Sequence, residues 1–146
     1  MRLALLLLAG SILFPSEWPR TVPERTSHHR TSTVAEVEAF MGALARRDPA
    51  LKPYRPAGAP IRAEGGGPLR AWRLAATSQD AVRVYLNGNI HAGEVEGKEA
   101  LQQLVRELLQ GKHPALRRHL DLVVVPAYNP DATDALDPAI RPWQPN

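Results

Sequence analysis

The feature that most constrains the fold is a strand, a helix and a second strand that follow one another between residues 81 and 126. Residues 81–86 alternate apolar and polar side chains, which is typical of a strand with one buried face. Residues 96–110 have helical periodicity, and Gly111 provides a stop. Residues 122–125 form a short unbroken apolar run, which favours a strand buried on both faces. The apolar positions are Val82, Val84 and Leu86 in the first strand and Ala100, Leu101, Leu104, Val105, Leu108 and Leu109 in the helix.

A helical crossover of this length implies that the two strands pair in parallel, so we expect an α/β fold. Ligands of such sheets bind in the loops that follow the carboxyl ends of the strands. We therefore expect catalytic or ligand-binding residues in the loops that follow Leu86 and Val125.

Upstream of this unit, residues 33–36 (Thr-Val-Ala-Glu) match a capping box and start a helix expected to reach about Arg47, where Asp48-Pro49 stops it. Residues 49–68 are rich in proline and glycine, which favours loops with one short strand near Leu51. Residues 69–76 are interpreted as a strand of mixed exposure.

The chain is expected to begin with a targeting segment. Arg2 precedes the apolar run 3–14, which is too short to span a bilayer but matches a secretory signal. We therefore predict a signal peptide over residues 1–16 and a secreted or periplasmic protein with no stable membrane span. A disordered apolar N-terminus and a retained anchor are the alternatives. Residues 17–32 have no apolar period and are expected to form a linker or extended arm.

Composition excludes several classes of function. The chain has no cysteine, so any metal must be held by histidines and carboxylates. The net charge of +3 comes from scattered arginines, and aromatic residues make up only 5%. Nucleic-acid binding usually needs a clustered basic face with aromatic side chains, so we expect no nucleic-acid partner.

The loop after the first strand holds the pair of residues best suited to chemistry. His91 and Glu94 lie three positions apart, so a turn would bring an imidazole nitrogen and a carboxylate to one side. Zinc accepts both ligand types, and a hydrolytic zinc site typically has three protein ligands and a water. The alternative is a surface loop in which Glu94 and Glu96 only favour the N-terminus of the following helix.

The amino-acid sequences of two segments resemble those of a known family. Residues 87–100 (Asn-Gly-Asn-Ile-His-Ala-Gly-Glu-Val-Glu-Gly-Lys-Glu-Ala) resemble the first zinc-ligand segment of the zinc carboxypeptidases, peptidase family M14. Residues 125–132 (Val-Pro-Ala-Tyr-Asn-Pro-Asp-Ala) are similar to the family's strand followed by Asn-Pro-Asp-Gly. The resemblance implies that His91 and Glu94 bind Zn²⁺. It also implies a mixed, partly parallel sheet flanked by helices, with the metal at strand ends.

The family's chemistry is implied in the same way. It is hydrolysis of a peptide substrate by a zinc-bound water, with a glutamate base and an arginine that stabilises the oxyanion. In the family, the third zinc ligand, a histidine, and the glutamate base lie further along the sequence than the segments that match here. Residues 141–144 (Arg-Pro-Trp-Gln) have Gln144 where digestive-type members have that arginine. Other polar side chains are expected to have structural roles. We expect His113 and His119 to be solvated or to cap helices, and Asn129 and Asp131 to stabilise a turn.

We therefore expect residues 33–146 to be the N-terminal part of a truncated zinc carboxypeptidase-like domain, inactive alone. Two other functions remain open. One is a deacylase of small N-acyl amino acids on the same fold, which uses the same ligand pair. The other is a non-catalytic remnant or binding module.

Overall fold

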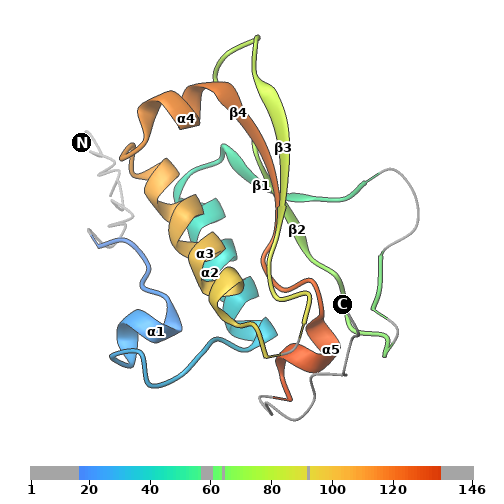
Figure 1. Ribbon diagram of the computed structural model, residues 1–146. Helices are drawn as coiled ribbons and strands as arrows, with labels where there is room; N and C mark the ends of the chain where they lie inside the picture. Colours follow the sequence, from blue (N-terminus) through green and yellow to red (C-terminus); the bar gives the residue numbers. More distant parts are fainter. Residues whose placement is uncertain (1–16, 57–60, 64, 92, 136–146) are drawn as a thin grey trace, which may run out of the picture.

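The computed structural model describes residues 17–56, 61–63, 65–91 and 93–135 (Figure 1). Its helices are α1 (Val22–Arg25), α2 (Val34–Arg47), α3 (Glu96–Leu109), α4 (Pro114–His119) and α5 (Pro130–Thr133), and its strands are β1 (Leu51–Tyr54), β2 (Ala71–Leu74), β3 (Val82–Asn87) and β4 (Leu120–Val125). Within these ranges, none of the helices combines the length and apolar character that a membrane span needs. The predicted signal segment lies outside the described residues.

The four strands form one mixed sheet in the order β1-β2-β4-β3. β1 and β2 are antiparallel, as are β2 and β4, whereas β3 and β4 are parallel and in register from Val82↔Leu120 to Asn87↔Val125. Figure 1 shows α2 and α3 side by side along one face of this sheet. The expected α/β fold with a mixed, partly parallel sheet is confirmed.

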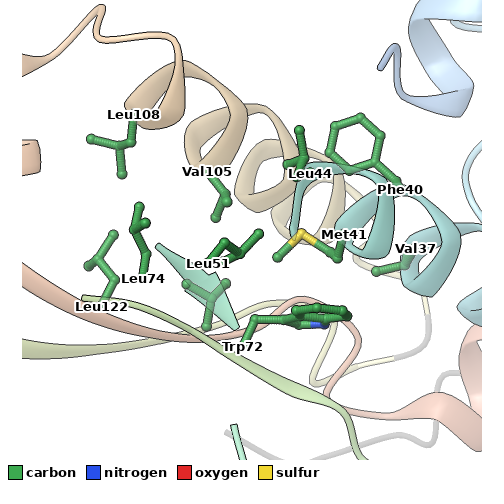
Figure 2. Packing of buried hydrophobic residues seen from close by; sticks show 11 residues of the cluster. Val37, Phe40, Met41, Leu44, Leu51, Trp72, Leu74, Val105, Leu108 and Leu122 are labelled. Atoms are coloured by element: carbon green, nitrogen blue, oxygen red, sulfur yellow. The ribbon is translucent and has the colours of Figure 1, made fainter. Parts of the chain in front are cut away.

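The hydrophobic core lies between these two helices and the sheet (Figure 2). α2 begins with the predicted capping box, in which Thr33 and Glu36 exchange side-chain and backbone hydrogen bonds. Truncation of a buried leucine or methionine to alanine typically costs about 2 to 5 kcal/mol, so this cluster is a main source of stability. Its members are Val37, Phe40, Met41, Leu44, Leu51, Trp72, Leu74, Val105, Leu108, Leu122 and Val124.

The inner strand β4 is buried along nearly its whole length, as its apolar run predicts. Side chains alternate across the sheet, so Leu122 and Val124 join the core while Asp121 lies on the other face. There the Asp121 carboxylate accepts hydrogen bonds from Arg73 Nε at 2.7 Å and Arg83 Nε at 2.9 Å. These guanidinium groups, Arg73 first, lower the pKa of Asp121. The ion pairs therefore tie β2, β4 and β3 together on that face.

Three details differ from the expected pattern. Val82 is 64% exposed at the start of β3, whereas Val84 and Leu86 pack against the core as predicted. Ala100 is exposed rather than part of the buried stripe of α3. The short helix α4 was not expected, since six residues are too few to show a helical period.

The segment 17–32 is not a simple extended arm, because it contains α1 and packs on α3. α1 has its own capping box, and Val22 is only 2% exposed. Arg106 of α3 donates two hydrogen bonds of 2.6 Å to the Glu24 carboxylate and one of 3.0 Å to the Pro19 carbonyl. Such bidentate guanidinium–carboxylate pairs have a fixed geometry, so they hold α1 against the helix.

A second polar attachment joins the same segment to the start of α3. The buried Glu99 carboxylate accepts hydrogen bonds from the Thr31 hydroxyl and from the Ser32 amide and hydroxyl. Lys98 is fully buried and donates to the Ser32 carbonyl, with its ammonium 3.7 Å from Glu99 Oε1. Loss of hydration lowers the pKa of Lys98, although Glu99 opposes this shift. Part of the polar surface of α3, including Lys98 and Glu99, is therefore buried as well.

The Glu24–Arg106 pair predicts a pH-dependent contribution to stability. Arg106 holds the pKa of Glu24 at about 2, below its ordinary value of 4.5. The contribution is present above the unfolded-state pKa and is lost as pH falls towards the folded-state value. We expect Glu24→Gln to lower the free energy of unfolding near pH 7 by about 1 to 2 kcal/mol, allowing for solvent screening.

Urea denaturation at several pH values measures this effect. The difference between Glu24→Gln and the unaltered chain should shrink as pH falls from 4.5 to about 2. Glu17→Gln is the control, because it removes an exposed carboxylate from the same segment and should have little effect. A difference that stayed constant with pH would contradict the assigned ion pair.

The buried lysine generates a second stability prediction. Lys98→Met keeps an unbranched side chain, one atom shorter, but leaves the Ser32 carbonyl without this donor and Glu99 without its neighbouring positive charge. We expect a loss of about 3 kcal/mol in unfolding free energy. Lys112→Met is the control, because the Lys112 side chain is 53% exposed and its loss should cost under about 0.5 kcal/mol. Equal effects of the two variants would refute the buried attachment.

Candidate metal centre

The candidate site begins where the end of β3 meets the start of α3. A Cβ atom at Gly88 would lie 2.7 Å from the carbonyl carbon of Gly97 and 2.8 Å from the amide nitrogen of Lys98. Only glycine permits so close an approach of two backbones. This contact brings the two ends of the loop that carries His91 and Glu94 together at the carboxyl end of the strand.

His91 and Glu94 come together in this loop. The amide of Glu94 donates to the carbonyl of His91 over 3.2 Å, which closes a turn between them. His91 Nδ1 lies 2.9 Å from Glu94 Oε2. The two side chains are 30% and 49% exposed, so solvent and ions can reach both groups. The turn that the sequence predicted for this pair is formed.

The donor atoms suit a zinc ion in type and spacing. Zinc binds imidazole nitrogen and carboxylate oxygen at about 2.0 to 2.2 Å, which places two ligand atoms of a tetrahedral site about 3.4 Å apart. A separation of 2.9 Å between His91 Nδ1 and Glu94 Oε2 needs only a small opening to reach that value. The assignment of these residues as metal ligands remains a prediction, with which the geometry is compatible.

The part of the chain that the structure describes brings no third histidine or carboxylate to this pair in a metal-binding group. His113 is the N-cap residue of α4, but its side chain makes no capping hydrogen bond, and its Nε2 atom lies 3.2 Å from Glu107 Oε2. His119 is exposed at the end of α4, and His28 and His29 are exposed beyond α1. None of these four histidines forms such a group.

The second motif segment lies directly beside the loop. The amide of Gly88 donates to the Val125 carbonyl at 3.0 Å, and the amides of Tyr128 and Asn129 donate to the carbonyls of Gly88 and Asn89 at 2.9 and 3.1 Å. The parallel β3–β4 ladder therefore continues past both strands. This pairing joins the loop that holds His91 to the residues that lead into α5.

Asn129 and Asp131 have the turn roles expected from the sequence. Asn129 caps α5 by accepting a hydrogen bond from the amide of Ala132. The Asp131 carboxylate accepts from the amides of Gly65 and Gly67 at 2.7 and 3.1 Å, which fixes the glycine-rich loop against α5. Residues 141–144, including Gln144, lie outside the described residues.

Two polar residues near the turn, Asn89 and Thr133, carry no motif that marks them in the sequence. Asn89 is 4% exposed, and its amide contacts the backbone carbonyls of both His91 and Glu94. Thr133 of α5 donates its hydroxyl hydrogen bond to Asn89 Oδ1. The sequence offers a weak signal for Asn89, because asparagine favours left-handed turns, and none for a partner 44 positions away.

Comparison with solved structures identifies similar folds. Bovine thrombin-activatable fibrinolysis inhibitor in complex with tick carboxypeptidase inhibitor matches with a TM-score of 0.60 and 16% identity over 72% of this chain and 33% of its own. A second structure of thrombin-activatable fibrinolysis inhibitor matches with a TM-score of 0.64 and 17% identity, over 75% of this chain and 28% of its own. Carboxypeptidase A from Helicoverpa armigera matches with a TM-score of 0.61 and 18% identity, over 71% of this chain and 26% of its own. The chain thus spans about a third or less of these proteins and shares their fold.

Of two sequence comparisons, one identifies the family of the chain. A search of curated proteins found no significant match. The family profile described as zinc carboxypeptidase matches residues 37–146, which include β3, the His91–Glu94 turn, α3 and β4. The chain therefore belongs to the zinc carboxypeptidase family, peptidase family M14.

Proposed function

We propose that this chain supplies two zinc ligands, His91 and Glu94, to a metallocarboxypeptidase centre that releases the C-terminal residue of a peptide. The observation that carries the proposal is the approach of His91 Nδ1 to Glu94 Oε2, 2.9 Å apart, at the carboxyl end of a strand in a parallel pair. Sites of α/β sheets lie at such strand ends. The family match over the same segment adds independent support.

The proposed centre assigns a definite protonation state to each ligand. Because Nδ1 is the imidazole nitrogen that faces Glu94, His91 would bind through the Nδ1 lone pair and keep its proton on Nε2. The Glu94 carboxylate would be ionised and contribute negative charge to the site. When bound, zinc supplies Lewis acidity that polarises a carbonyl group and lowers the pKa of a coordinated water to about 7.

The activity proposed for the whole protein needs more than this chain's described residues. A hydrolytic zinc site usually has three protein ligands, and the described residues bring two together. The chain also covers only 26 to 33% of the three similar solved chains. The predicted signal segment over residues 1–16 would place the activity outside the cytoplasm, where peptides are the proposed substrates.

Replacement of the histidine tests the ligand assignment. We expect the purified chain to bind Zn²⁺ weakly and His91→Ala to lose that binding, because one of the two converging ligands is gone. Competition with a chromophoric chelator measures the affinity. His119→Ala is the matched control, since it removes an exposed histidine at the end of α4 and should leave zinc binding unchanged. Stoichiometric zinc retained by His91→Ala would overturn the assignment.

The ligand count also predicts the catalytic behaviour of the chain itself. Because the described residues bring only two ligands together, we expect residues 1–146 to release no amino acid from peptides with varied C-terminal side chains. An amino-acid release assay with added zinc measures this, and a chelator-treated sample provides the background. Robust hydrolysis that the chelator abolishes would show that the chain carries a complete centre.

A further inference from the structure

Asn89 has an unusual backbone conformation for a residue with a side chain. Its φ is 56°, in the left-handed region that asparagine tolerates better than most residues. In this conformation the side-chain Nδ2 donates to the His91 carbonyl at 2.8 Å and the Glu94 carbonyl at 3.4 Å. One amide group therefore contacts both ends of the turn that brings His91 and Glu94 together.

The other end of the same amide is held by α5. Thr133 is 1% exposed, and its hydroxyl lies 2.5 Å from Asn89 Oδ1 and 2.6 Å from the Asn129 carbonyl. A hydroxyl has one proton, so Thr133 shares it between these two acceptors. Because the carbonyl of Asn89 also accepts from the Asn129 amide at 3.1 Å, both the backbone and the side chain of Asn89 are fixed to the segment after β4.

We propose that Asn89 is a positioning residue, anchored by Thr133, that holds the His91–Glu94 turn in the conformation that binds metal. The inference rests on the proposed function of that turn. It assigns Asn89 no contact with the ion: its amide fixes the backbone that carries both ligands. Groups that orient metal ligands in this way typically change metal affinity by about 10 to 100-fold when removed.

Substitutions can separate the amide from the backbone conformation. Asn89→Gly permits a positive φ without strain and removes only the amide group. Thr133→Val keeps the shape of the side chain without the hydroxyl, and Thr133→Ser keeps the hydroxyl. We expect Asn89→Gly and Thr133→Val to weaken Zn²⁺ binding by the intact chain about 10-fold. Thr133→Ser should restore an affinity close to that of the unaltered chain.

A control distinguishes positioning from loss of stability. Val105→Ala truncates a buried core residue of α3 outside the turn, so it should destabilise the fold and leave zinc affinity unchanged. Cobalt provides a spectroscopic readout, because its visible absorption reports ligand geometry. We expect an altered Co²⁺ spectrum in Asn89→Gly and an unaltered one in Val105→Ala. Equal loss of affinity in both variants would overturn the positioning role.

A metal-free measurement separates this inference from the proposed function. The amide of Glu94 closes the turn, and we expect its hydrogen exchange to be about 10-fold faster in Asn89→Gly. If the unaltered chain binds no zinc, the proposed function fails, while faster exchange still supports control of the turn by Asn89. If zinc binds normally and Asn89→Gly changes neither exchange nor affinity, the inference fails and the proposed function stands. Faster exchange with unchanged affinity also overturns the link to metal binding.

Discussion

The candidate site depends on the parallel pairing of β3 with β4. Parallel strands end at the same edge of a sheet, so this pairing places the loop after Asn87 beside the segment after Val125. Its hydrogen-bond ladder continues past the strands, through the Gly88 and Asn89 carbonyls. A register shift of one residue would turn core side chains to the other face and break these contacts. The geometry of the proposed ligands therefore follows from the strand register.

α3 connects this edge of the sheet to the rest of the chain by two different kinds of contact. Its apolar side packs in the core with α2, whereas Arg106 and Glu99 bind the segment before α2. At its start, the contact between Gly88 and Gly97 places the helix directly against the end of β3. The same helix thus fixes one side of the candidate loop and anchors the N-terminal segment.

Much of the sheet and of α2 could be predicted because their signals are local. The Thr33–Glu36 capping box and the apolar run 122–125 each lie within a few neighbouring residues. The turn formed by His91 and Glu94 also follows from their spacing. The packing of residues 17–32 could not be predicted, because Glu24 and Arg106 are 82 positions apart and both look like solvated surface charges. The hydrogen bond between Asn89 and Thr133 could not be predicted either, because these residues are 44 positions apart.

The attachment of residues 17–32 has a consequence for how the protein can be shortened. Removal of everything before residue 33 would deprive Arg106 of the Glu24 carboxylate and Glu99 of three hydrogen-bond donors. The charges of Arg106 and Glu99, which the intact chain keeps largely from water, would then lack these partners. The smallest version that keeps these partners starts no later than Pro19, whose carbonyl also accepts from Arg106. A protease that cut the chain after Glu24 would remove both of these partners of Arg106 and loosen the helix that borders the proposed zinc turn.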